Sequence, residues 1–190
     1  MAVLDWITPD RTLTLEGDRV WLRPPRSADY RAWQEIRRVS RDFLQPWEPT
    51  WPADDLSRAA YRRRLSIYAR DQELGHGYAF FVLRRGDDQL VGGINLREVR
   101  RGVGQMAAVG YWVGQPYVRQ GYGLEAVRAV TRFAFQQLGL HRLEASCVPE
   151  NDASHRLLLK AGFEHEGRAR AYLRIDGCWR DHLMFGLLNE

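Results

Sequence analysis

The sequence contains few of the features that mark secreted, metal-binding or membrane proteins. Its 190 residues include only two cysteines, Cys147 and Cys178, with no CxxC spacing and no His-rich partner segment. Neither a disulfide framework nor a zinc site is therefore indicated. No segment approaches the roughly 18 apolar residues of a membrane span, and the first ten residues lack the basic start and apolar stretch of a signal peptide. We expect no bound metal, no membrane contact and a cytoplasmic location.

Lysine is nearly absent as well, because Lys160 is the only lysine among 28 basic residues. The net charge of +4 is compatible with nucleic acid, a ribosomal surface or an anionic cofactor, and equally with an ordinary soluble enzyme. Genome composition explains the excess of arginine as readily as phosphate recognition does. There is also no acidic tract that would attract a polycation, which disfavours a polyamine or aminoglycoside substrate.

The composition that remains is that of one ordered globular domain. Hydrophobic residues make up 45% of the chain and charged residues 27%, as in proteins with a substantial core. We expect a single domain over residues 1–190, with 1–18 as an N-terminal extension. Strands are expected at 19–24, 78–85, 89–99, 107–114, 142–148, 171–175 and 179–188, and helices at 27–40, 56–74, from Gly123 to Gly139, and from Asn151 or Asp152 to Gly162. This order indicates an α+β fold rather than strict β-α alternation.

Two glycines, Gly121 and Gly123, stand where a strand gives way to a helix. The first N–H groups of a helix lack intrahelical partners, and the macrodipole places a partial positive charge there. Glycine lets an anion approach this backbone closely. Residues 119–124 are therefore interpreted as a pyrophosphate cradle, with an ordinary strand-to-helix turn as the alternative. A Rossmann site is disfavoured, since Ala126 replaces the third glycine of its motif.

A second polar block follows the next expected strand. Asn151 and Ser154 are one helical turn apart, just after a strand that is expected to run beside the one ending at Val113. If those strands separate, both side chains lie on the rim of the slot between them. The alternative is a structural role, with Asn151 as a helix N-cap and Ser154 as a residue of the first turn.

Together, the segments RQGYGLEA and NDASHRLLLKAGF resemble the acetyl-CoA signature of the GNAT N-acetyltransferases. The segments FLQPWEP and GFEHEGRARAYLRIDGCWRDH are similar to the RimJ/RimL branch, which acetylates the N-terminal amine of ribosomal proteins. The resemblance implies a mixed, mostly antiparallel sheet of six or seven strands with flanking helices and a splayed strand pair. It also implies acetyl transfer from acetyl-CoA to an amine. Acetylation of a small-molecule amine and a non-catalytic acyl-CoA-binding or ribosome-assembly protein remain open as alternatives.

The resemblance also assigns roles to individual residues. The cosubstrate would be bound by Tyr111, Trp112, Val113, Arg119, Gln120, Gly121, Tyr122, Gly123, Leu124, Asn151 and Ser154. The tyrosine that usually protonates the departing thiolate is missing, since its helix here contains Leu157, Leu158 and Leu159. RimL-like members have a serine at the place of Ser154, so the resemblance makes Ser154 the candidate to protonate or hydrogen-bond the thiolate. Cys147 is interpreted as a packed strand residue rather than an acyl-enzyme nucleophile.

On the acceptor side the sequence offers candidates rather than a recognisable dyad. An α-amino group with a pKa of about 7.7–8.0 needs less help to lose its proton than a lysine near 10.4. Glu48, in the rigid PWEP loop, is the preferred base or ammonium anchor, with Asp181 and His182 as alternatives. The expected walls of the acceptor groove are Trp47, Asn95, Tyr111 and Tyr172. An arginine run at 62–64 suggests either rRNA contact or a solvated helix face, and the sequence leaves monomer and homodimer open.

Overall fold

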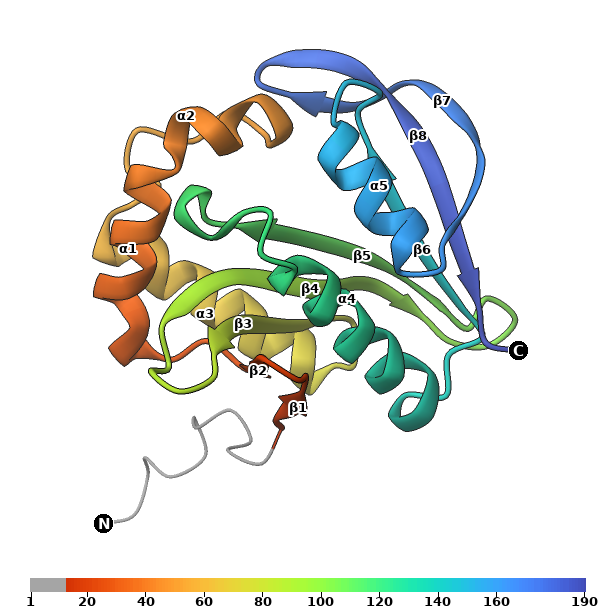
Figure 1. The fold of residues 1–190 in the computed structure, drawn as a ribbon, viewed down its shortest axis with the longest axis horizontal. Helices are drawn as coiled ribbons and strands as arrows, with labels where there is room; N and C mark the ends of the chain where they lie inside the picture. The colour runs from red at the N-terminus through yellow and green to blue at the C-terminus, as the bar shows by residue number, and fades with distance from the viewer. Residues whose placement is uncertain (1–12) are drawn as a thin grey trace.

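The chain is built around one long mixed sheet. The structure is a computed structural model and describes residues 13–190. In Figure 1 the sheet runs through the middle of the molecule, with α4 and α5 in front of it and α3 behind it. The strands are β1 (Leu15–Glu16), β2 (Val20–Arg23), β3 (Tyr78–Arg84), β4 (Leu90–Arg100), β5 (Met106–Val113), β6 (Arg142–Cys147), β7 (Glu164–Ile175) and β8 (Cys178–Leu188). The helices are α1 (Tyr30–Val39), α2 (Arg41–Leu44), α3 (Arg58–Glu73), α4 (Tyr122–Arg132) and α5 (Asp152–Lys160).

The predicted α+β class and the mostly antiparallel sheet are confirmed. The strand order is β1-β2-β3-β4-β5-β6-β8-β7. Within residues 13–190, only the β5–β6 pair is parallel. The chain enters β6 through the crossover helix α4, as a parallel pair requires.

The sheet has eight strands over residues 13–190, more than the six or seven expected. The additional strand, β1, lies inside the segment interpreted as an N-terminal extension and pairs with β2; residues 1–12 lie outside the described part of the chain. β7 also begins at Glu164, well before the expected start at residue 171. Its first half is charged and exposed at the edge of the sheet, so it lacks the apolar alternation by which strands are recognised.

Two apolar clusters fill the two faces of the sheet. The larger lies under α4 and α5 and includes Val127, Val130 and Leu158. The smaller lies under α1 and α3 and includes Trp33 and Tyr61. α4 is held in place because its apolar residues recur at helical spacing, which buries one face. The sheet therefore separates a face covered by α4 and α5 from a face covered by α1 and α3.

The strands β5 and β6 separate part of the way along their length. Their pairing covers only Met106 to Ala108 on β5 and Arg142 to Glu144 on β6. Beyond Glu144, β6 stays paired with β8 as far as Cys147, while β5 stays paired with β4 as far as Val113. The facing edges of Val109–Val113 and Ala145–Cys147 are therefore not joined by a ladder. We call this opening the split, and the expectation of a splayed strand pair is confirmed.

Candidate active site

An uncapped helix start lies at the side of the split. α4 follows Gly121, which has a φ of 87°, and Arg119 also has a positive φ, of 61°. No side chain within residues 13–190 caps this helix. Its first hydrogen bond runs from the Glu125 N–H to the Gly121 carbonyl, so the N–H groups of Tyr122, Gly123 and Leu124 have no intrahelical acceptor. Such a helix start attracts an anion.

Glycine is needed at positions 121 and 123 for two different physical reasons. A Cβ on Gly121 would lie 2.6 Å from Nη2 of Arg19, and its backbone is in a region that side chains other than glycine rarely adopt. A Cβ on Gly123 would lie 2.9 Å from Leu157 and 3.2 Å from Val113. Gly121 therefore shapes the turn, whereas Gly123 lets the start of α4 fit between the end of β5 and α5.

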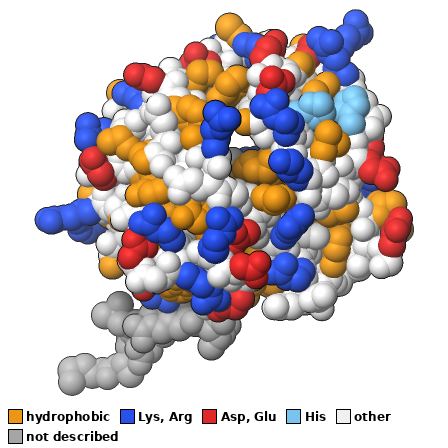
Figure 2. Space-filling view, viewed as in Figure 1, with side chains coloured by type: hydrophobic (Ala, Val, Ile, Leu, Met, Phe, Trp, Pro, Cys, Tyr) orange, Lys and Arg blue, Asp and Glu red, His pale blue; other side chains and the backbone are white. Residues whose placement is uncertain are grey.

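Basic side chains surround the opening on this face. Figure 2 shows a hollow near the middle of the face that carries α4 and α5, with Lys and Arg side chains around it. Arg119 is exposed and has no ion-pair partner within residues 13–190. Arg19 binds Glu125, the acidic residue in the first turn of α4, through Nε at 2.6 Å. Arg19 thus neutralises the one carboxylate of that turn, and the helix start stays electropositive.

A pair of hydroxyls joins the two sides of the split. The Tyr111 hydroxyl on β5 lies 2.7 Å from Oγ of Ser154 on α5. Asn151 caps α5, because its Oδ1 accepts a hydrogen bond of 3.0 Å from the Ser154 N–H. This cap fixes the first turn of α5 and, with it, the position of Ser154. The sequence-predicted Tyr111, Asn151 and Ser154 are thus brought together.

The hydroxyl of Tyr111 is the functional group that the sequence analysis missed. The sequence indicated Tyr111 only as a residue whose backbone binds the cosubstrate and as a wall of the acceptor groove. Strand alternation carried the missing signal, because it places Tyr111 on the same face as the buried Ala107 and Val109. That face is covered by α4 and α5, where Ser154 lies.

The groups around this pair are held in their neutral forms. Burial raises the pKa of the Tyr111 hydroxyl and outweighs the opposing hydrogen bond with Ser154. Burial also raises the pKa of the Cys147 thiol, again against a smaller effect of Ser154. A buried thiol with a raised pKa is a poor nucleophile, which supports the interpretation of Cys147 as a packed strand residue.

On the opposite face, Glu48 is held by a buried arginine. Its carboxylate accepts two hydrogen bonds from Arg37, at 2.8 and 2.7 Å, and one of 2.7 Å from Nε1 of Trp51. The Arg37 guanidinium lies over Trp51 at 4.0 Å from the ring centroid and over Trp112 at 5.1 Å. Trp112 belongs to β5, so this cluster connects the Glu48 loop to the strand that borders the split. Three of the roughly four lone-pair sites of the carboxylate are occupied, which leaves one for a ligand.

The two alternatives to Glu48 on β8 have different surroundings. A hydrogen bond from the Ala171 N–H lowers the pKa of the Asp181 carboxyl, and a hydrogen bond from Arg168 lowers it further. Asp181 is therefore a weak base. His182 is only 3% exposed, and burial lowers the pKa of its imidazole. Its Nδ1 lies 3.1 Å from the Arg180 carbonyl oxygen, and the ring packs edge-on against Tyr172 at 5.7 Å. The other ring nitrogen, Nε2, has no hydrogen-bond partner within residues 13–190 and is the one left to accept a proton.

A bridge connects two walls on this side of the molecule. The N–H of Asp176, in the turn between β7 and β8, donates to the Glu48 carbonyl at 2.9 Å. Gln45 Nε2 donates to the Asp176 carboxylate at 3.0 Å. The predicted wall residues divide accordingly, since Trp47 lies in the 3-10 turn Gln45–Trp47 next to this bridge, whereas Asn95 lies on β4 opposite Gly110 of β5.

The arginine run at 62–64 is partly neutralised. Arg63 pairs with Asp54, and Arg64 pairs with Asp55. Within residues 13–190, no helix is both long and apolar enough to cross a membrane. The same part of the chain contains no group of three or more His, Cys, Asp or Glu side chains with the geometry of a metal site.

Comparisons with known proteins agree with this geometry. The family model described as "Acetyltransferase (GNAT) domain" matches residues 19–164. The probable N-acetyltransferase YjcK of Bacillus subtilis is 34% identical over 92% of this chain and 97% of its own. The ribosomal protein uS5-alanine N-acetyltransferase of Escherichia coli is 33% identical over 95% of this chain and 89% of its own. A solved structure of Mycobacterium smegmatis RimJ in complex with CoA-disulfide has a TM-score of 0.89 and 31% identity, over 94% of this chain and 88% of that one. The protein therefore belongs to the GNAT family of N-acetyltransferases.

Proposed function

We propose that this N-acetyltransferase transfers the acetyl group of acetyl-CoA to the N-terminal α-amino group of a protein, with a ribosomal protein as the leading acceptor. The observation that carries the proposal is the Tyr111–Ser154 hydroxyl pair across the split, at 2.7 Å, beside the uncapped start of α4. The name of the E. coli relative specifies the alanine of a ribosomal protein, and the M. smegmatis RimJ structure contains CoA as a disulfide. These names support both the cosubstrate and the class of acceptor.

The residues around the split fit the parts of acetyl-CoA. The backbone of residues 119–124 suits a diphosphate, because the N–H groups of Tyr122 to Leu124 have no intrahelical acceptor and Arg119 and Gly121 have positive φ angles. The edge of Tyr111, Trp112 and Val113 that faces the split suits the amide groups of the pantetheine arm, as an additional strand would. The Nδ2 group of Asn151 has no partner within residues 13–190 and can donate to the same arm.

The hydroxyl pair suits the departure of the CoA thiol. Acetyl-CoA supplies an activated thioester, whose C–S bond breaks as the amine nitrogen forms the C–N bond. The released sulfur needs a proton, and Ser154 can donate one. Tyr111 returns a proton to Ser154, and solvent returns one to Tyr111, so that both hydroxyls are protonated at the end of the cycle. Burial raises the pKa of the Tyr111 hydroxyl, so Tyr111 is protonated at neutral pH. A positioned proton donor of this kind contributes about 10²–10⁴-fold to a rate.

The other side of the split suits a weakly basic amine. An α-amino group is already about a tenth neutral at pH 7, so a modest acceptor for its proton suffices. Glu48 retains one free lone-pair site and is assigned to orient the amine. The buried, neutral imidazole of His182 is assigned to take up the proton. A protein N-terminus needs no stronger base, whereas a lysine side chain would.

The direct test is to incubate the protein with acetyl-CoA and a panel of N-terminal peptides and intact ribosomal proteins. We expect free thiol to appear together with the mass gain of one acetyl group at the acceptor's N-terminus. A small primary amine and a peptide blocked at its N-terminus serve as controls. If only small amines gain an acetyl group, the protein-acceptor assignment is wrong, and if no thiol is released with any amine, the enzymatic assignment fails too.

A further inference from the structure

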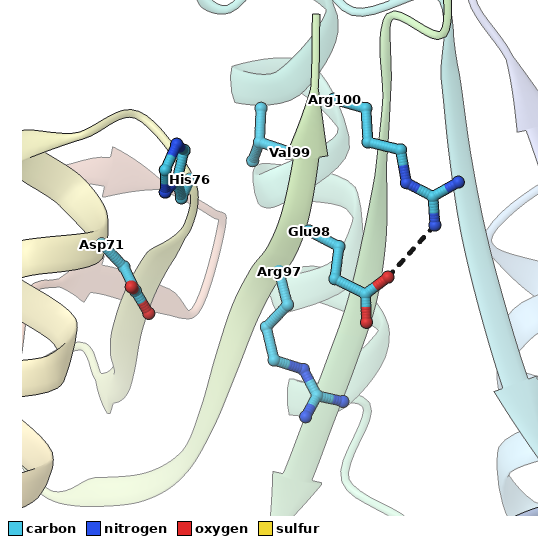
Figure 3. A pocket seen from close by; sticks show the side chains of 6 residues that line it. All are labelled: Asp71, His76, Arg97, Glu98, Val99 and Arg100. Atoms are coloured by element: carbon cyan, nitrogen blue, oxygen red, sulfur yellow. Dashed lines mark hydrogen bonds and ion pairs between the residues drawn. The ribbon is translucent and has the colours of Figure 1, made fainter.

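A polar groove runs along the sheet face that α3 covers. It consists of two adjoining hollows of about 430 and 300 Å³, both lined by α3 and β4. Asp71 and Arg97 line both hollows. Figure 3 shows Asp71 and His76 on one side and the β4 residues Arg97 to Arg100 on the other. None of the residues that line the groove belongs to the cosubstrate cradle.

One end of the groove approaches β5, the strand that borders the split. Gly110, on β5, is adjacent to Tyr111 and opposite Asn95 of β4. A Cβ on Gly110 would lie 2.9 Å from Oδ1 of Asn95 and 3.1 Å from Nη2 of Arg97. The polar ends of both β4 side chains therefore lie over Gly110, on the face of β5 opposite the Tyr111 side chain.

The groove contains polar groups whose partners are missing within residues 13–190. Oδ1 of Asn95 is buried and accepts no hydrogen bond. Arg97 and Asp71 form no ion pair with one another or with other described residues, whereas the neighbouring Glu98 and Arg100 pair with each other at 3.1 Å. A buried acceptor without a donor is costly, and the N–H of a bound chain would satisfy it. The Arg97 guanidinium would likewise form an ion pair with an acidic group of the ligand.

The dimensions of the groove match a short extended peptide. Neighbouring strands are about 4.8 Å apart, so the distance from β5 across β4 to β3 is roughly 10 Å. An extended chain advances about 3.4 Å per residue, and three residues therefore cover this distance. The bridge from Asp176 to Glu48 ties together the β7–β8 turn and the Gln45–Glu48 loop, so these two walls are fixed relative to one another. The sheet face under α3 offers an extended chain a path of the required length.

We propose that this groove binds the second to fourth residues of the acceptor polypeptide. Asn95 accepts a backbone N–H of that chain, and Arg97 selects an acidic side chain close to the acceptor's N-terminus. Asp71 lies on the opposite wall of the groove from Arg97. The inference rests on the proposed function, because it assumes a peptide acceptor, and it adds the length and charge of that acceptor.

The first test uses peptides that share their N-terminal residue and increase in length one residue at a time, with amidated C-termini. We expect kcat/KM to rise about tenfold from one to four residues, which corresponds to roughly 1.4 kcal/mol, and then to level off. A value that is independent of length would overturn the groove assignment, provided that the peptides are acetylated. A failure to acetylate any peptide, with small amines still accepted, would instead overturn the proposed function.

The second test reverses the charge of Arg97. The Arg97→Glu variant is compared with Arg62→Glu, which changes an exposed arginine of α3 outside the groove. With Glu at the second or third position of the peptide, Arg97→Glu is expected to lower kcat/KM by about fivefold, the upper end for an exposed ion pair. With Lys at that position of the peptide, Arg97→Glu should raise kcat/KM by a similar factor. Equal effects on acidic and basic peptides, or the same pattern in Arg62→Glu, would refute the role of Arg97. Binding of CoA and the melting temperature should be unchanged in both variants.

Discussion

Gly121 and Gly123 are separated by one residue, yet a side chain at each position has a different consequence. At Gly121 the backbone is left-handed, and the N–H groups that follow it have no intrahelical acceptor. At Gly123 the space is filled by Leu157 and Val113. A substitution at Gly123 therefore tests helix packing, whereas one at Gly121 tests the anion site.

The Gly121→Val variant is expected to lose most of its affinity for CoA. Valine resists the φ of 87° and places a Cβ against Arg19, so the N–H groups of the turn can no longer surround a diphosphate. Gly75→Val is the matched control, since Gly75 has a φ of 67° with nothing within 4 Å of its Cβ position. Isothermal calorimetry should show a loss of at least about tenfold in affinity for Gly121→Val and little change for Gly75→Val. Equal affinities would contradict the cradle.

The hydroxyls of Tyr111 and Ser154 act as one unit if the proposed proton donation is right. Ser154→Ala and Tyr111→Phe should each reduce kcat by about tenfold or more, with little change in acetyl-CoA affinity. The double variant should lose little more than either single one, because each substitution already breaks the relay. Cys147→Ala is expected to keep most of its activity. Strictly additive losses in kcat would show that the two hydroxyls act separately.

At the scale of an element, the loop that carries Glu48 depends on α1. Arg37, which is 6% exposed, binds the Glu48 carboxylate through two nitrogens and packs between Trp51 and Trp112. The Arg37 guanidinium, which projects from α1, therefore holds the Glu48 loop in place. It also packs against Trp112 of β5, the strand that borders the split. Without it, the Glu48 carboxylate would remain partly buried with Trp51 as its remaining hydrogen-bond donor.

The Arg37→Met variant should accordingly lose about 3–5 kcal/mol of its free energy of unfolding, as when one partner of a buried ion pair is removed. Arg38→Met is the matched control. Arg38 pairs with Glu35 on the same helix, but both side chains are more than 60% exposed, so its removal should change the free energy of unfolding far less. Urea unfolding measures both values. Similar losses in the two variants would mean that Arg37 contributes no more than a surface residue.

Local sequence signals predicted most of the helices and strands. They could not predict contacts between segments that are far apart in the sequence. Asn151 was recognisable as a cap because capping depends on residues three apart. The link between Arg37 and Glu48 was not recognisable, because Glu48 lies in a loop whose path depends on Trp51 and on the packing of α1. The charged start of β7 was missed for a related reason, since edge strands need no apolar alternation.

At the scale of the whole molecule, the split depends on partners that β5 and β6 take on their outer sides. β5 stays paired with β4 and β6 with β8 beyond the point where the two part, so each strand keeps a complete ladder on one edge. The order of the expected elements and the resemblance to a family together predicted this opening. Periodicity alone could not, because it says nothing about where two neighbouring strands diverge.

The dependence of stability on pH is a second property of the whole molecule, and His182 is expected to dominate it between about pH 5 and 7. Burial lowers the pKa of its imidazole below the ordinary value of 6.5. The groups around it are the Tyr172 ring, the Arg180 carbonyl and the side chains of Arg180 and Asp181. Well above pH 6.5 the imidazole is neutral in both the folded and the unfolded chain, so it adds no pH dependence there.

As the pH falls below 6.5 toward the lowered pKa, His182 binds a proton in the unfolded chain but stays neutral in the folded protein. The free energy of unfolding should then decrease, by at most about 1.4 kcal/mol per pH unit for one group. His182→Gln should flatten this slope, whereas substitution of the exposed His141 should preserve it. The measurement is urea unfolding at several pH values above 5, because paired carboxylates such as Asp181, whose pKa is also lowered, titrate at more acidic pH. An unchanged slope in His182→Gln would show that His182 accepts its proton in the folded protein as readily as in the unfolded chain, and it would remove the physical reason for assigning a neutral, buried imidazole to the acceptor amine.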